Sequence, residues 1–199
     1  MRILIGRMVK PAFALPIADL LDSNFLFWGA AAQFYAEASE DFVRDTIFTP
    51  IGIDGRCRSS DEFDTRQYNW PPDGQPGYIE PDRLLSCGGF GWQLSTNELG
   101  AFMAHLRYTG TLINSDTRKQ MDTLFLGWLD PTEFGWSTGT FGLYHNHGGD
   151  WFHTPGEAHT CIMKFPINVE VSVAMNSERN FVRHQCTILR DAFDASWVA

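Results

Sequence analysis

The residues after Gly127 limit the fold more than any other part of the chain, because the spacing of apolar residues changes there. Three segments, 142–147, 160–165 and 169–175, alternate in character and predict short strands. The last two are joined across residues 166–168, which favours an antiparallel hairpin. A final helix is expected after Ser177, its N-cap, with one apolar face formed by Val182, Cys186, Leu189 and Phe193.

Helical signals come earlier in the chain. Residues 95–98 spell a capping box, and the apolar positions that follow recur at helical spacing, so a helix is predicted from there to about Tyr108. Shorter helices are expected over residues 25–32, from Ser39 to a point before Pro50, and after a cap at Ser115 or Asp116. The order of helices, strands and a covering helix predicts an α+β fold rather than repeated βαβ units.

Length and composition narrow the class of protein. The 199 residues suit a single domain, and 44% hydrophobic residues are typical of a packed globular chain. The formal net charge of −9 argues against a nucleic-acid partner. No apolar run is long enough to predict a transmembrane segment, and Lys10 and Pro11 interrupt the run that a signal peptide needs. The sequence leaves the cellular location open.

Residues 54–81 are rich in Gly, Pro, Asp and Arg without a period, and we interpret them as a long surface loop. The four cysteines are far apart and form no C-x-x-C pair. Because Cys161 and Cys186 fall within apolar patterns, buried free thiols are the preferred interpretation. No cofactor is predicted.

Four stretches, taken in chain order, carry a resemblance to a known family. They are residues 16–24, residues 47–53 (I-F-T-P-I-G-I), a run from C-G-G at 87–89 through S-T-N-E-L at 95–99 to G-T-L-I at 110–113, and H-N-H-G-G at 145–149. Together they resemble the later landmarks of the serine β-lactamase-like family, which holds class C β-lactamases, related esterases and D-alanyl-D-alanine carboxypeptidases. The resemblance implies a truncated β-lactamase/transpeptidase-like fold.

The resemblance also implies roles for individual residues. Asp22 stands where the family has a tyrosine base, and Asn24 stands where the family binds substrate. The strand from His147 through Gly148 and Gly149 to Asp150 resembles the K-T-G-type strand, whose backbone holds the oxyanion of the acyl-transfer intermediate. Two consecutive glycines let a backbone approach a ligand closely.

The nucleophile of the family has no counterpart. Its serine and lysine lie in an S-x-x-K motif. The three lysines here, Lys10, Lys119 and Lys164, are preceded at that spacing by Arg7, Asp116 and Cys161. The expected function is therefore that of a serine-hydrolase relative, acting in its family on β-lactams, esters or D-alanyl peptides, which is inactive as this chain. The alternative is a non-catalytic module that keeps the cleft for a small-molecule, peptide or protein ligand.

Other residues admit two readings each. Ser137 fits G-x-S-x-G and is a candidate nucleophile or an ordinary turn serine. Asp22 is a candidate base or part of a helix cap. The histidines at 145, 147, 153 and 159 are candidate zinc ligands or rim residues, and no metal site is predicted from them. An aromatic cluster suits either a ligand cleft or the core: Trp128, Phe134, Trp136, Phe141, Tyr144, Trp151 and Phe152.

The truncated fold has a consequence for its sheet. Because the full family sheet uses additional strands, an edge is expected to be open, and an open edge is an association site. The prediction is self-association along that edge, or its coverage by residues 1–16.

Overall fold

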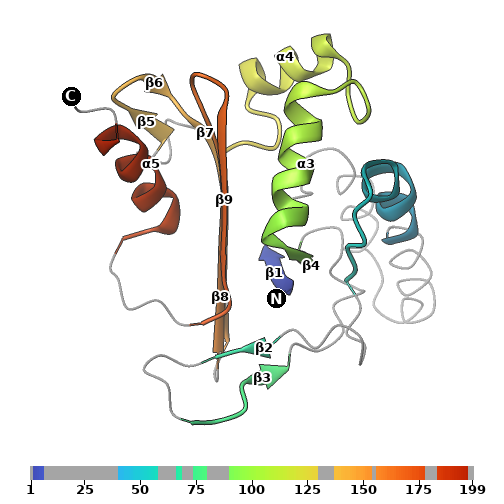
Figure 1. Ribbon diagram of the computed structural model, residues 1–199, viewed down its shortest axis with the longest axis vertical. Coiled ribbons are helices and arrows are strands. Elements are labelled where there is room, and N and C mark those ends of the chain that lie inside the picture. The colour runs from blue at the N-terminus through green and yellow to red at the C-terminus, as the bar shows by residue number, and fades with distance from the viewer. Residues whose placement is uncertain are drawn as a thin grey trace, which may run out of the picture.

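The structure is a computed structural model that describes residues 2–6, 40–57, 66–68, 74–79, 90–129, 137–153, 156–177 and 183–196. It is a mixed α+β fold with antiparallel sheets and a C-terminal helix, as Figure 1 shows. Asp22 and Asn24 lie outside the described residues, as does the helix expected over residues 25–32. The truncated β-lactamase fold itself stays a prediction.

The central feature is a three-stranded sheet in the order β7-β8-β9 (His145–His153, Gly156–Phe165 and Val169–Met175). Both pairings are antiparallel, which confirms the predicted hairpin around residues 166–168. Two of its turn residues, Ile167 and Asn168, have φ of 58° and 61°, in the left-handed region. The other pairing, between β7 and β8, aligns Asp150 with His159, so these side chains share one face.

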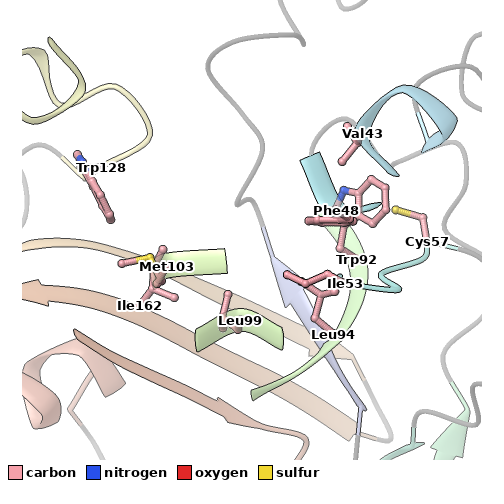
Figure 2. Close-up of a cluster of buried hydrophobic side chains, with 10 residues drawn as sticks. All are labelled: Val43, Phe48, Ile53, Cys57, Trp92, Leu94, Leu99, Met103, Trp128 and Ile162. Carbon is pink, nitrogen blue, oxygen red and sulfur yellow. The ribbon is translucent and has the colours of Figure 1, made fainter. Parts of the chain in front are cut away.

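Helix α3 (Thr96–Tyr108) covers one face of this sheet and contacts β9. Its capping box forms as predicted: Ser95 Oγ accepts the Glu98 N–H at 3.2 Å, and the Glu98 carboxylate accepts the Ser95 N–H at 2.7 Å. Figure 2 shows the core cluster on this side, in which Leu99 and Met103 of α3 lie near Ile162 of β8. Packing of α3 against this face therefore buries one side of the sheet.

Helix α5 (Gln185–Ala195) covers the opposite face. The alternation of β8 puts Cys161, Met163 and Phe165 on this side, opposite to Ile162. Phe165 stacks on Phe193 of α5 with ring centroids 4.0 Å apart. The helix begins at Gln185 with His184 as its N-cap, so the predicted cap at Ser177 is wrong, and Ser177 instead forms a β-bridge with Tyr68.

Two shorter pairings complete the sheets. Strand β4 (Phe90–Ser95) pairs antiparallel with β1 (Arg2–Gly6), and neither strand was predicted from the sequence. Because β1 pairs with β4, its residues do not extend the β7-β8-β9 sheet. Strands β5 (Thr138–Gly139) and β6 (Gly142–Leu143) form a small ribbon before β7, so the strand expected over 142–147 is interrupted at Tyr144.

The segment expected as a surface loop contains structure. Strands β2 (Arg66–Gln67) and β3 (Tyr78–Ile79) pair antiparallel, and the side chains of Cys57 and Gln67 are fully buried. Tyr68 N–H donates to the carbonyl of Asn176 at 2.7 Å, which ties this ribbon to the end of β9. The described parts of residues 54–81 are therefore not a simple solvated excursion.

Helical structure also differs in detail from prediction. Residues 40–43 are helical and continue as the π-helix η1 (Arg44–Phe48) and the 3₁₀ helix η2 (Thr49–Ile51). Pro50 lies in the first turn of η2, where no N–H is needed, so helical structure does not stop before it. Helix α4 (Ser115–Leu124) is capped by Asn114, one residue before the predicted caps.

The cysteines correct the prediction of free thiols. Cys161 and Cys186 form a disulfide between β8 and α5, and Cys57 is also disulfide-bonded. Burial in an apolar pattern predicts equally a buried thiol and a buried disulfide. The pairing depends on how α5 packs on β8, which the sequence spacing does not determine.

Candidate functional site

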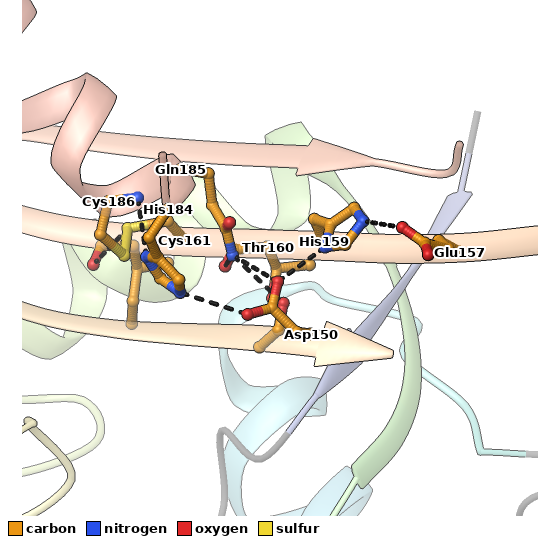
Figure 3. A network of polar contacts seen from close by, with 10 residues as sticks. Asp150, Glu157, His159, Thr160, Cys161, His184, Gln185 and Cys186 are labelled. Atoms are coloured by element: carbon orange, nitrogen blue, oxygen red, sulfur yellow. Dashed lines mark hydrogen bonds and ion pairs between the residues drawn. A yellow bond between two sulfur atoms is a disulfide. The ribbon is translucent and has the colours of Figure 1, made fainter. Parts of the chain in front are cut away.

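The polar contacts of the sheet converge on Asp150, near the end of β7. Its Oδ1 lies 2.6 Å from Nδ1 of His159, its neighbour across the β7-β8 pairing. The Asp150 side chain is 22% exposed and the His159 side chain is fully buried. Figure 3 shows the two residues within a network that joins β7, β8 and the first turn of α5.

His184 contributes the second imidazole to Asp150. Its Nδ1 accepts the backbone N–H of Cys186 at 3.2 Å, which caps α5. A ring nitrogen that accepts carries no hydrogen, so the other nitrogen, Nε2, must carry it. This Nε2 lies 3.3 Å from Asp150 Oδ2, and we assign it as the donor to the carboxylate.

Gln185 donates to the same region from the first residue of α5. Its Nε2 lies 2.8 Å from the carbonyl of Thr160, 3.1 Å from Asp150 Oδ1 and 3.4 Å from the carbonyl of Gly149. Gln185 is buried, and one amide group therefore bridges β7, β8 and α5. An amide in this position can satisfy buried carbonyls that the sheet leaves unpaired.

His159 lies between two carboxylates. Its Nε2 is 2.8 Å from Glu157 Oε2, while its Nδ1 faces Asp150. Ionised carboxylates only accept hydrogen bonds, and a neutral imidazole has a single N–H. His159 can donate to both carboxylates only as the imidazolium, which would make the group a buried cation shared by two anions.

The pKa of Asp150 is held well below its usual range. Burial by itself raises the pKa of this carboxyl, but hydrogen bonds from His159, His184 and Gln185 lower it by more. The carboxylate is consequently ionised at neutral pH. The site is a fixed anion held by imidazole and amide donors.

Gly148 serves packing within the protein. A Cβ placed on it would lie 2.7 Å from His184 Cε1 and 3.3 Å from Cys186 Sγ. The expected close approach at the paired glycines therefore exists, but at Gly148 the approaching group is the first turn of α5. The predicted ligand contact at Gly148 is therefore wrong, because α5 occupies the face of β7 on which Gly148 lies.

His147 lies on the other face of β7 from Gly148 and Asp150, because side chains alternate along a strand. His145, on the same face as His147, donates through Nε2 to the Asp122 carbonyl of α4 at 2.9 Å. Of the four residues assigned by resemblance on β7, Asp150 alone has its side chain in the network. His147 is directed toward the α3 side.

Ser137 is 1% exposed, and its Oγ accepts an N–H of Asn146 at 3.0 Å. Its carbonyl accepts the N–H of Tyr144 at 2.7 Å. The chain continues from Ser137 into the β5-β6 ribbon, whereas a nucleophile elbow leads into a helix. This geometry favours an ordinary structural serine.

The aromatic cluster is divided by the structure. Tyr144 is fully buried and Trp128 is 8% exposed, whereas Phe141 and Phe152 lie on the surface. A hollow with Trp128 in its wall lies between α3, α4 and β8, far along the sheet from Asp150, and its other lining residues are Met103, Leu106, Arg107, Arg118, Met121, Asp122 and Lys164. Phe134 and Trp136 lie outside the described residues.

Glu157, His184 and Gln185 were missed as site residues by sequence reasoning. Had β7 been predicted to extend to His153, antiparallel pairing across the β7-β8 turn would have aligned Asp150 with His159. No local pattern connects His184 to Asp150. Their contact depends on where α5 begins.

Within the described ranges, no group of three or more His, Cys, Asp or Glu side chains is arranged to hold a metal ion. In the same ranges, no helix has the length and apolarity needed to cross a bilayer.

Comparison of the chain with protein-family models, with curated proteins and with solved structures finds no match.

Proposed function

We propose that this chain is a relative of serine β-lactamase-like hydrolases that performs no acyl transfer by itself and acts as a ligand-binding module. The ligand class suggested by the resemblance is a β-lactam, a short ester or a D-alanyl peptide. The observation that carries the proposal is the use of the K-T-G-like strand: its Asp150 is bonded to His159, His184 and Gln185 rather than to a nucleophile.

The missing S-x-x-K motif and the surroundings of Ser137 support the non-catalytic part of the proposal. The chain has no S-x-x-K motif, and a Ser nucleophile needs both an adjacent base and access to substrate. Ser137 is buried, and its described side-chain partner is the amide of Asn146, which is not a base. Acyl transfer through Ser137 would require that residue to leave its present position.

The partial exposure of charged and polar side chains around Asp150 supports the binding part of the proposal. Asp150, Glu157 and His184 have side chains between 17% and 23% exposed, so each is fixed by hydrogen bonds yet reaches solvent. Fixed polar groups bind a ligand with little loss of side-chain entropy. We place the binding surface at these three side chains, around Asp150 on β7.

Covalent labelling tests the non-catalytic part. The protein is incubated with a fluorescent penicillin and, separately, with a fluorophosphonate, and its intact mass is measured. We expect no adduct, since the chain has no S-x-x-K motif and Ser137 has no adjacent base among the described residues. An adduct on Ser137 would overturn the proposal and identify an active hydrolase.

Thermal shift measurements test the binding part with penicillin G and with a peptide ending in D-alanyl-D-alanine. A ligand that binds only the folded state raises the melting temperature in a saturable way. We expect this rise for at least one of the two, with weaker affinity in Glu157→Gln and unchanged affinity in the control Asp116→Asn, at an exposed position of α4. No saturable shift with either ligand would contradict the binding role.

A further inference from the structure

The first turn of α5 is attached to the sheet by three consecutive residues, two through hydrogen bonds and one through a disulfide. His184 contacts the Asp150 carboxylate at 3.3 Å, and Gln185 donates to the Thr160 carbonyl at 2.8 Å. Cys186 is joined covalently to Cys161 of β8. Figure 3 shows the three side chains pointing from α5 toward β7 and β8.

These attachments depend on one another. The backbone N–H of Cys186 donates to His184 Nδ1, so a displacement of Cys186 moves the imidazole that binds Asp150. Both sulfur atoms belong to fully buried residues, and Gly148 leaves no spare room beside Cys186 Sγ. Two thiols need more space than a disulfide, because unbonded sulfur atoms must keep a van der Waals separation.

We propose that the Cys161–Cys186 disulfide is a redox latch that keeps His184 and Gln185 on Asp150. A small dithiol is the reductant. One of its thiolates attacks a sulfur of the pair and forms a mixed disulfide, and its second thiol displaces that bond. The dithiol becomes a cyclic disulfide, and Cys161 and Cys186 gain two electrons and two protons as free thiols.

Reduction lets Cys186 move away from β8, and the first turn of α5 follows. Asp150 then loses His184 and Gln185 but keeps His159, its neighbour in the sheet. The far end of α5 stays attached, because Phe193 stacks on Phe165 and the Asp194 carboxylate accepts the Thr140 N–H at 3.0 Å. The latch therefore opens one end of the helix and uncovers Asp150, whatever ligand the β7 surface binds.

Hydrogen exchange with mass spectrometry tests the latch on the intact chain. The oxidised protein is compared with protein reduced by dithiothreitol, and alkylation followed by mass measurement counts the free thiols. We expect exchange of the amides at residues 185–190 to rise about tenfold or more on reduction. Exchange in β9 should rise far less, because its antiparallel pairing with β8 does not depend on the disulfide.

A double variant, Cys161→Ser with Cys186→Ser, separates this bond from the disulfide of Cys57, which it leaves intact. It should show the fast exchange at residues 185–190 without reductant. If the variant does not fold, Cys57→Ser compared with and without dithiothreitol isolates the Cys161–Cys186 bond instead.

Nuclear magnetic resonance supplies a second signature, which a merely stabilising disulfide would not change. The oxidised protein should show a slowly exchanging His184 Nε2–H signal that disappears on reduction. Unchanged exchange in α5 with thiol formation confirmed, or exchange that rises equally in β9, would overturn the latch.

Discussion

The Asp150 carboxylate receives contacts from the polar side chains of His159, His184 and Gln185. Burying a carboxylate is costly unless it is paired and hydrogen-bonded. Here His159 and His184 each face one oxygen, and Gln185 adds an amide donor. The cost of burial is offset by donors from two other elements, so this residue couples β7 to β8 and α5.

Replacing Asp150 by asparagine should lower the free energy of unfolding at pH 7 by about 1–3 kcal/mol, because the amide cannot accept from both imidazoles as the carboxylate does. The pKa of Asp150 is lower in the folded than in the unfolded protein. Its stabilisation is therefore complete above the unfolded value of about 4 and is lost as the pH falls below it.

Urea unfolding at pH 7 and pH 3 measures this effect, and the difference between wild type and Asp150→Asn should shrink at the lower pH. Asp45→Asn, at an exposed position of η1, is the matched control and should change stability little. Equal stability of wild type and Asp150→Asn at pH 7 would contradict the assigned network.

Helix α5 is the element whose placement creates the site. Its N-cap is a histidine, which is not among the residue types that usually begin a helix. The cap is selected by tertiary contact, because the same imidazole that accepts from Cys186 N–H also reaches Asp150. The close approach of α5 to β7 requires that Gly148 has no side chain.

Gly148→Ala should destabilise the protein by about 1–3 kcal/mol, since a methyl group would collide with the His184 ring at 2.7 Å and α5 would have to shift. Gly110→Ala is the matched control, because a Cβ there meets nothing within 4 Å. Chemical unfolding of both variants makes the comparison. A Gly148→Ala protein as stable as Gly110→Ala would show that α5 is not seated this closely.

At the scale of the whole molecule, one sheet separates two clusters of buried side chains. The α3 side contains Leu99, Met103 and Ile162, and the α5 side contains Tyr144, Met163 and Phe165. Covalent bonding through Cys161 reinforces the second side. Disulfides form and persist mainly in oxidising environments, so the Cys161–Cys186 bond is typical of a protein that folds in such an environment.

Phe165→Ala should lower the free energy of unfolding by about 3–5 kcal/mol, because it removes a ring that contacts both Tyr144 and Phe193 and leaves a cavity under α5. Phe152→Ala makes the same change at a residue that is 62% exposed and should cost much less. Urea unfolding followed by circular dichroism compares them. Similar losses in the two variants would argue against α5 packing on this side of the sheet.

Local signals predicted part of this architecture. The α3 capping box lies within four consecutive residues, and the β8-β9 hairpin follows from alternation on both sides of a short turn. Weak local signals failed: β4 contains Gly91 and no clear alternation, and it forms because β1, remote in sequence, pairs with it. The resemblance singled out the backbone N–H of Asp150, whereas the network forms around its carboxylate and partners that the resemblance did not name.

The α+β class, helix α3 and the β8-β9 hairpin could be predicted from the sequence alone, since each depends on residues a few positions apart. Tertiary structure decided where α5 begins, which cysteines are joined and which donors hold Asp150. Those contacts connect residues separated by tens of positions, such as His184 with Asp150 and Cys186 with Cys161. Each of them exists because burial of two apolar faces brings the helix onto the sheet, and the periodicity that predicts these faces does not predict how they align.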